Sequence, residues 1–194
     1  MSHYLYIQDT LSDHLSLTNR VIADAKLQDQ IHTSVENIVT CFRNGNKVLL
    51  CGNGGSAADA QHIAAEWQGR YLMERRPLFA EALHVNTSYL TAVANDYGFE
   101  HVYARAVEAQ AQPGDILIAL STSGNSPNIC KALQMAKTKG MIRIGFTGEN
   151  KDTCLVANCD ILINIPSRIT ARIQEMHMLI AHIICEETEK QLFS

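Results

Sequence analysis

Short apolar runs alternate with amphipathic segments along most of the chain, and this alternation constrains the fold more than any other feature. The apolar runs occupy residues 47–51, 78–85, 116–120, 142–146 and 161–165. Segments with helical spacing follow them, at about 57–74, 88–95, 100–111, 127–139 and 168–192. Strands that alternate with helices predict an α/β fold, in which a parallel sheet of about five strands carries helices on both faces.

Two helices are predicted ahead of the first strand, over residues 4–44. Apolar residues recur at helical spacing in both, at Leu11, Leu15 and Ile22 and then at Ile31, Val35, Ile38 and Phe42. These apolar faces could pack on the sheet or serve an interface. The chain has no Pro- or Ser-rich linker, so we expect one domain over residues 1–194. Its N-terminal helical pair would span 1–45 and its α/β core 46–194.

Charge and hydropathy exclude several classes of function. The chain has 16 Lys and Arg against 20 Asp and Glu, without the basic excess that is typical of nucleic-acid binding. No apolar run approaches the length of a membrane span, and residues 1–13 lack the pattern of a secretory signal. We therefore expect a cytoplasmic protein that binds neither nucleic acid nor membrane.

The six cysteines predict free thiols rather than a disulfide framework. They stand at Cys41, Cys51, Cys130, Cys154, Cys159 and Cys185. None belongs to a C-x-x-C pair and several lie in apolar runs, as is usual for buried thiols of a reducing cytoplasm.

Two loops of small polar residues follow the first and third apolar runs. The segment C-G-N-G-G-S at 51–56 aligns with S-T-S-G-N-S at 121–126, so that Gly54 matches Gly124 and Ser56 matches Ser126. Each loop opens a helix, where backbone N–H groups attract anions. Ligands of open α/β sheets bind at this end of the strands. The loops therefore predict a phosphate site, although turns and helix caps favour the same residues.

A dinucleotide is a weaker candidate for the first loop. Gly52-x-Gly54-x-x-Ala57 satisfies the permissive dinucleotide fingerprint. The following apolar run ends at Val85-Asn86 without the acid that would hold a ribose, and no G-K-[ST] motif occurs. We expect no nucleotide cofactor.

The helix predicted after the first loop carries a polar stripe. Asp59, His62, Glu66 and Arg70 are spaced three, four and four residues apart, so they share one helical face. A His-x-x-x-Glu pair can bind a divalent metal or act as an acid/base pair, although a solvated polar face is commoner. In the last helix, His182 is a second candidate, and a hydrogen-bonded core histidine is the alternative.

The motifs together resemble the phosphoheptose isomerases, which are sedoheptulose 7-phosphate isomerases of the sugar isomerase (SIS) fold. The matching segments are C-G-N-G-G-S at 51–56, D-A-x-H-x-A-x-E at 59–66, G-R at 69–70, A-N-D-Y-G-F at 94–99, S-T-S-G-N-S at 121–126 and R-I-Q-E-x-H at 172–177. The resemblance implies a flavodoxin-like, three-layer α-β-α sandwich and a homotetramer with active sites between subunits. It also implies isomerisation of D-sedoheptulose 7-phosphate, the first step toward the heptose of lipopolysaccharide.

The resemblance further implies the roles of individual residues. Zinc would be held by His62, Glu66, Gln174 and His182, with Glu66 and His182 also matching the acid/base pair. The phosphate would be bound by Ser56, Ser121, Thr122, Ser123 and Ser126. The sugar would be lined by Asn53, Gly54, Gly55, Arg70, Asn95, Asp96 and Gln174.

One departure and one rival accompany this resemblance. Ala171 stands where some family members carry an acid. The same C-terminal segment also resembles a regulator of this fold that binds the replication initiator DnaA and lacks the catalytic His and Glu. Because His62, Glu66 and His182 are all present, the sequence favours the enzyme.

Overall fold

Five parallel strands form the centre of the computed structural model, which describes residues 3–194. The strands are β1 (Val48–Gly52), β2 (Ala80–Ala82), β3 (Ile116–Leu120), β4 (Ile142–Thr147) and β5 (Ile161–Asn164). They pair in the order β2-β1-β3-β4-β5, and every pairing is parallel. This is the strand order of flavodoxin-like sheets, so the predicted fold class is confirmed.

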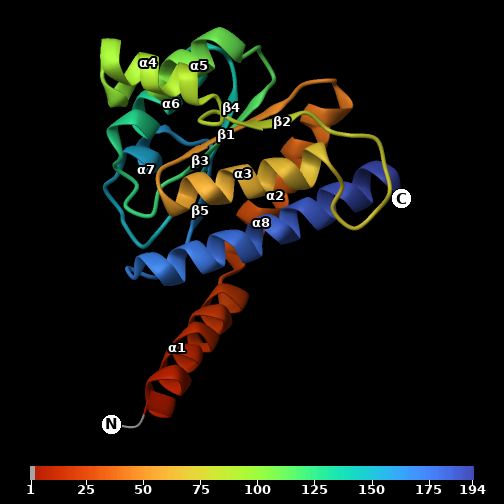
Figure 1. The fold of residues 1–194 in the computed structure, drawn as a ribbon. Coiled ribbons are helices and arrows are strands. Elements are labelled where there is room, and N and C mark those ends of the chain that lie inside the picture. The colour runs from red at the N-terminus through yellow and green to blue at the C-terminus, as the bar shows by residue number, and fades with distance from the viewer. Residues whose placement is uncertain (1–2) are drawn as a thin grey trace.

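Helices cover both faces of the sheet (Figure 1). One face carries α2 (Ala25–Arg43), α3 (Gly55–Gln68) and α8 (Thr170–Phe193). The other carries α4 (Thr87–Tyr97), α5 (Val102–Gln110), α6 (Pro127–Thr138) and α7 (Cys154–Asn158), with a 3₁₀ turn η1 (Phe99–His101) between α4 and α5. In β1, Val48 and Leu50 enter the first core, whereas Leu49 and Cys51 enter the second, because successive side chains of a strand point to opposite faces.

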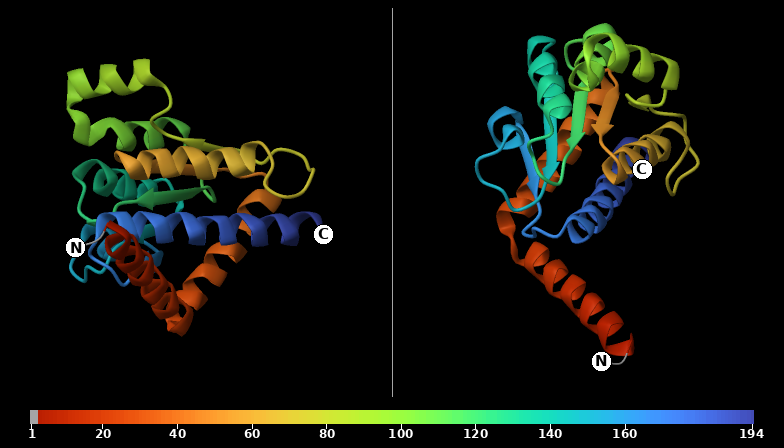
Figure 2. Two further views of the ribbon diagram at one scale, coloured as in Figure 1. Left: turned by 60° about the horizontal axis from the view of Figure 1, so that its bottom comes forward. Right: turned by 60° about the vertical axis from the view of Figure 1, so that its left-hand side comes forward.

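The N-terminal helix α1 (His3–Ala23) extends away from the sandwich (Figures 1 and 2). Leu17 and Val21 are buried near its end, where Asp24 caps α2 by accepting a hydrogen bond from the N–H of Leu27 at 3.0 Å. An exposed apolar stripe runs along another side of α1 and consists of Tyr4, Ile7, Leu11, Leu15 and Ile22. These five residues fall within an arc of about 80° on the helix.

Three elements differ from the sequence expectation. The helix α3 ends at Gln68 rather than near Glu74, so Arg70 lies beyond it. The strand β2 spans only Ala80–Ala82 of the apolar run 78–85, and the short helix α7 was not predicted. No helix among residues 3–194 combines the length and apolar character that crossing a membrane requires.

The cysteine prediction is confirmed at four positions and wrong at two. Cys41, Cys51, Cys159 and Cys185 are free, but Cys130 and Cys154 form a disulfide that joins α6 to α7. Cys130 and Cys154 are 24 residues apart in the sequence and meet only in the fold. Their spacing therefore did not indicate a disulfide.

Because one histidine is buried, we predict that the fold loses stability in mild acid. His177 on α8 lies against Phe146, and its Nε2 is 3.3 Å from the carbonyl oxygen of Thr147. Burial lowers its pKa from 6.5 to about 4. Between those values the unfolded chain binds a proton that the folded chain does not. The free energy of unfolding should therefore fall by about 3 kcal/mol as the pH drops through this window, as denaturant titrations across it would measure.

A matched pair of variants isolates this contribution. His177→Gln keeps a donor for the Thr147 carbonyl but cannot become charged, so its stability should vary less with pH in this window. His32→Gln, at a side chain that is 68% exposed, should keep the wild-type slope. If His177→Gln has the wild-type slope, another group causes the pH dependence.

Candidate active site

The two predicted loops lie side by side because their strands are neighbours. The glycine loop, residues 53–56, follows β1, and the serine loop, residues 121–126, follows β3. The amides of Asn53 and Asn128 exchange two hydrogen bonds of 2.9 Å across the gap. The strand that follows β1 in the sequence lies on one side of it and the next strand lies on the other, so the strand order reverses at β1. Ligands of open α/β sheets bind at such switch points. The sequence did not single out Asn128, whose role depends on this pairing.

Two glycines allow close approach in the glycine loop. Gly54 has a φ of 56° and a ψ of −121°, which side-chain-bearing residues rarely adopt. A Cβ on Gly55 would lie 2.6 Å from the Nε2 of Gln174. The side chain of Gln174 therefore rests against the first turn of α3, next to Ser56.

The serine loop gathers hydroxyl groups around Ser121. Its Oγ lies 3.2 Å from Oγ of Ser126 and 3.4 Å from Oγ of Ser123, and it accepts the N–H of Gly124 at 3.2 Å. A cavity of about 200 Å³ opens beside the loop. It is lined by Thr122, Ser123, Asn150, Arg168, Thr170 and Ile173. Arg168 brings a positive charge to this cavity, which the sequence reading missed because the residue precedes α8 and is far from the loop in the sequence.

A cluster of His62, Glu66 and His182 forms where α3 and α8 lie side by side (Figure 1). We call it the catalytic cluster after the role that is proposed for it below. Nε2 of His62 is 3.0 Å from Oε1 of Glu66, and the rings of His62 and His182 are 5.1 Å apart between centroids. The three residues offer ligand atoms that all lie within 4.8 Å of one another. His182 is half-buried at this cluster, which favours a site residue over a core histidine.

The catalytic cluster fits a zinc ion by the chemistry of its donors. Two imidazoles and a carboxylate are ligands that zinc prefers, and three protein ligands with an open position are typical of catalytic zinc. Gln174, the fourth predicted ligand, lies instead against Gly55 at the start of α3. One chain thus brings three of the four together.

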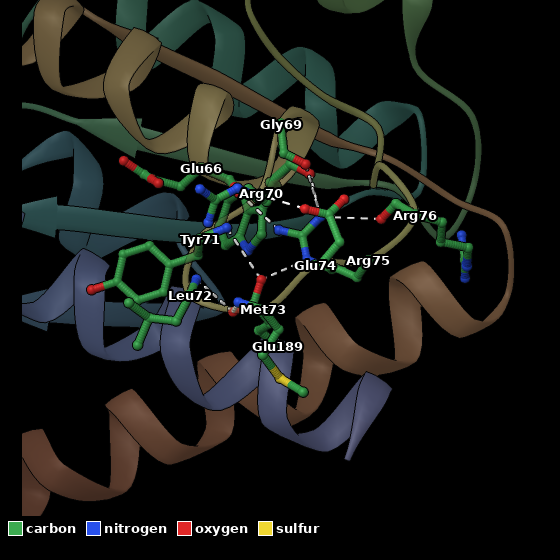
Figure 3. A network of polar contacts seen from close by, with 11 residues as sticks. Glu66, Gly69, Arg70, Tyr71, Leu72, Met73, Glu74, Arg75, Arg76 and Glu189 are labelled. Carbon is green, nitrogen blue, oxygen red and sulfur yellow. Dashed lines mark hydrogen bonds and ion pairs between the residues drawn. The ribbon is translucent and has the colours of Figure 1, made fainter.

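A buried ion pair fixes the segment that follows α3 (Figure 3). Glu189 of α8, which is 1% exposed, accepts the backbone N–H groups of Tyr71, Leu72 and Met73 and the Nε of Arg75. Burial by itself raises the pKa of Glu189, but these hydrogen bonds hold it below its ordinary value.

The same network reaches the catalytic cluster at two points. Arg75 donates to the backbone carbonyl of Glu66 at 2.8 Å. The ring of Tyr71 stacks on His182, with 5.8 Å between centroids and 28° between planes. Burial and then nearby acidic groups, Glu66 among them, raise the pKa of Tyr71. The sequence did not single out Tyr71, because its ring contacts His182 only in the folded chain.

The other predicted site residues are not part of the catalytic cluster as the structure forms it. Arg70 is exposed and pairs with Glu74 at 3.8 Å. Asn95 and Asp96 are exposed on α4, over the opposite face of the sheet, and bond to each other at 2.9 Å. Asp59 lies on the same face of α3 as His62. Burial raises the pKa of Asp59.

Comparisons with known proteins identify the family of the chain. A sequence model of the SIS domain matches residues 13–148. Phosphoheptose isomerase from Aneurinibacillus thermoaerophilus is 45% identical, over 97% of this chain and 94% of that protein. The corresponding protein from Clostridium acetobutylicum is 44% identical, over 97% and 95%.

Solved structures give the same result. Phosphoheptose isomerase from Neisseria gonorrhoeae superposes with a TM-score of 0.90 at 37% identity, covering 97% of this chain and all of that one. The protein from Francisella tularensis gives 0.92 at 34%, covering 98% and 100%. The fold and the site thus define a SIS-domain protein. Within that class, the chain belongs to the phosphoheptose isomerase family.

The buried ion pair should be a major source of stability. In Glu189→Gln, the guanidinium of Arg75 loses its buried counter-charge, so the free energy of unfolding should fall by about 3 kcal/mol. Denaturant unfolding would measure the loss.

Glu187→Gln provides the matched control on the same helix. The side chain of Glu187 is 45% exposed and pairs with Lys190, so its loss should leave stability near wild type. Equal stabilities of the two variants would contradict the importance of the buried pair.

Proposed function

We propose that the protein is a phosphoheptose isomerase that converts D-sedoheptulose 7-phosphate into D-glycero-D-manno-heptose 7-phosphate. The observation that carries this proposal is the meeting of Glu66 and His182 at one cluster, in a chain similar to phosphoheptose isomerases over nearly its whole length. A regulator that binds the DnaA initiator would not need this acid/base pair. We expect the reaction in the cytoplasm, as the first step toward the heptose of lipopolysaccharide.

The two side chains can account for every proton that the isomerisation moves. Glu66 takes the proton from C1 of the ketose while His182 gives a proton to O2, which yields an enediol. His182 then takes the proton from O1 while Glu66 returns its proton to C2. This second step forms the aldose and restores both side chains. Acid/base pairs of this kind need to lie within hydrogen-bond reach of the reacting atoms.

Two neighbours support this chemistry by position. His62, whose Nε2 is 3.0 Å from Glu66, fixes the carboxylate at one end. Tyr71 limits the rotation of the His182 ring by stacking on it. Both contacts reduce the reorganisation needed before proton transfer.

We further propose one zinc ion per subunit at the catalytic cluster, with no nucleotide cofactor. His62, Glu66 and His182 offer the ligand atoms from one chain. Because a tightly bound ligand cannot also transfer a proton, Glu66 and His182 would move protons only while free of the ion. A zinc ion bound there supplies a Lewis acid for negative charge that develops on the substrate oxygens.

The position of Gln174 supports an active site between subunits. Gln174 and His182 are about two turns apart on α8, or about 12 Å along the helix, whereas two ligands of one zinc ion lie within about 4 Å of each other. If Gln174 is a ligand, it therefore serves the cluster of another subunit. The positions of Asn95 and Asp96 on α4, over the opposite face of the sheet, fit the same arrangement.

The phosphate would be bound at the glycine and serine loops. The donors would be the hydroxyls predicted from the sequence, at Ser56, Ser121, Thr122, Ser123 and Ser126. Asn53 joins the two loops, and Gly54 and Gly55 leave room beside Gln174. Arg168 adds the one cationic side chain among the residues that line the adjoining cavity.

Replacing the proposed base should abolish turnover. Glu66→Gln keeps the shape of the side chain but cannot take the C1 proton, so kcat should fall by about 100-fold or more. NMR would follow the aldose that forms from sedoheptulose 7-phosphate, and metal analysis of the same samples would give the zinc content.

Glu108→Gln is the control, because Glu108 is exposed on α5, which packs on the opposite face of the sheet from α3. It should turn over at the wild-type rate. Wild-type protein that does not turn over with or without added zinc would refute the proposed function. A Glu66→Gln variant with normal kcat would refute the assigned base.

The stripe on α1 supports a homotetramer. Its five apolar residues are exposed in the single chain on a helix that extends from the sandwich, and a second copy would bury them. Leu11, which is 65% exposed, lies within the stripe. Leu11→Glu should therefore dissociate the assembly, as measured by light scattering after size-exclusion chromatography.

Ser16→Glu adds the same charge to a different face of α1. Ser16 is exposed and lies more than a quarter-turn from the stripe, so this variant should remain a tetramer. A tetrameric Leu11→Glu variant, or a monomeric wild type, would contradict this interface.

A further inference from the structure

The disulfide between Cys130 and Cys154 lies at the serine loop. Cys130 is in the first half of α6, and Cys154 is the first residue of α7. Their Cα atoms are 5.9 Å apart, which is ordinary for a disulfide. Both residues are half-buried, so small solutes can reach them.

The start of α7 is built against the serine loop. The N–H of Cys154 donates to Oδ1 of Asn125 at 2.9 Å, and the N–H of Leu155 donates to the carbonyl of Gly124 at 3.1 Å. Thr153 packs so closely that a Cβ on Gly124 would lie 2.7 Å from its Oγ1. Whatever fixes the start of α7 therefore also fixes one side of the loop.

Cys130 is attached to the other end of the same loop. Its N–H donates to the carbonyl of Ser126 at 3.0 Å, in the first turn of α6. The disulfide thus joins the helix that follows the serine loop to the helix that braces it.

The four remaining cysteines are poor competitors for an oxidant. Burial raises the pKa of Cys41 and Cys159 to about 12, and burial raises the pKa of Cys51 and Cys185 as well. Thiols react as thiolates, so these four are chemically protected. Cys154 differs, because the side-chain amide of Asn158 lies 3.6 Å from its sulfur and can stabilise a thiolate there.

We propose that Cys130 and Cys154 are a reversible thiol–disulfide site, oxidised by a low-molecular-weight disulfide such as oxidised glutathione, and that the bond holds the serine loop in its phosphate-binding form. Disulfides of cytoplasmic proteins are usually transient and redox-sensing, which reconciles this pair with the four free thiols.

The exchange balances in two steps. The Cys154 thiolate attacks one sulfur of oxidised glutathione, which forms a mixed disulfide and releases one glutathione thiolate. The Cys130 thiolate then attacks the Cys154 sulfur of the mixed disulfide and releases the second glutathione. The protein loses two protons and two electrons, and oxidised glutathione becomes two molecules of reduced glutathione.

The state of the bond should change substrate binding more than chemistry, an expectation that rests on the proposed function. Without the bond, only hydrogen bonds and packing hold the start of α7 to the loop, so more conformational freedom must be lost when the phosphate binds. We expect the reduced enzyme to have a KM about three- to tenfold higher. Its kcat should be nearly unchanged, because the catalytic cluster stands on α3 and α8.

The test compares oxidised and reduced protein directly. Wild-type protein is treated with oxidised glutathione or with a phosphine reductant, which avoids the zinc chelation of dithiols. Intact mass should be lower by about 2 Da after oxidation, and alkylation mapping should show Cys130 and Cys154 protected. Steady-state kinetics on each form then give KM and kcat.

Three variants complete the experiment. Cys130→Ser and Cys154→Ser should both show the reduced KM in either buffer, whereas Cys159→Ser should keep the wild-type response. The proposal is overturned if oxidation leaves the two cysteines free, if the two forms have the same KM, or if a Cys130 or Cys154 variant still responds.

A binding measurement separates this inference from the proposed function. If neither form turns over sedoheptulose 7-phosphate, the proposed function fails. Calorimetric titration of inorganic phosphate into both forms then decides the inference. Tighter binding to the oxidised form supports it, and equal or absent binding refutes it.

Discussion

The carboxylate of Glu189 is the constraint on which the geometry of the site depends. It meets three backbone N–H groups and one guanidinium inside the protein. Burying a charge is costly, but the cost is offset when hydrogen bonds satisfy its lone pairs. Because Arg75 also binds the carbonyl of Glu66, one ion pair ties the end of α3, the segment after it and α8 together. The catalytic cluster stands on the two helices that this pair joins.

The proposed phosphate end of the site depends on the order of the strands in the sheet rather than on the net charge of the chain. β1 and β3 are neighbours, so their loops meet and the amides of Asn53 and Asn128 can join them. A chain with a net charge of −4 does not attract an anion by its overall field. In the proposed site, local donors would replace that field, namely the loop hydroxyls, the backbone N–H groups and Arg168.

The sequence predicted the features that local pattern determines. The strands β1 and β3 are buried along their whole length, so their apolar runs were clear, and the spacing of His62 and Glu66 placed both on one face of α3. Features set by distant partners were missed. The end of α3 at Gln68 follows from the contacts of Glu189 with the next segment. Likewise, the contacts of Tyr71, Asn128, Arg168 and Cys154 join residues far apart in the chain.

The site therefore has two halves that are held by different means. The ion pair of Glu189 and Arg75 holds the half that contains the catalytic cluster, on the face of the sheet covered by α3 and α8. Hydrogen bonds and the Cys130–Cys154 bond hold the serine loop of the proposed phosphate site, through α6 and α7 on the opposite face. Since the sheet separates these supports, a change in one can leave the other intact. Binding and chemistry could then be adjusted separately in one small protein, because the residues proposed to position the phosphate are not those proposed to move protons.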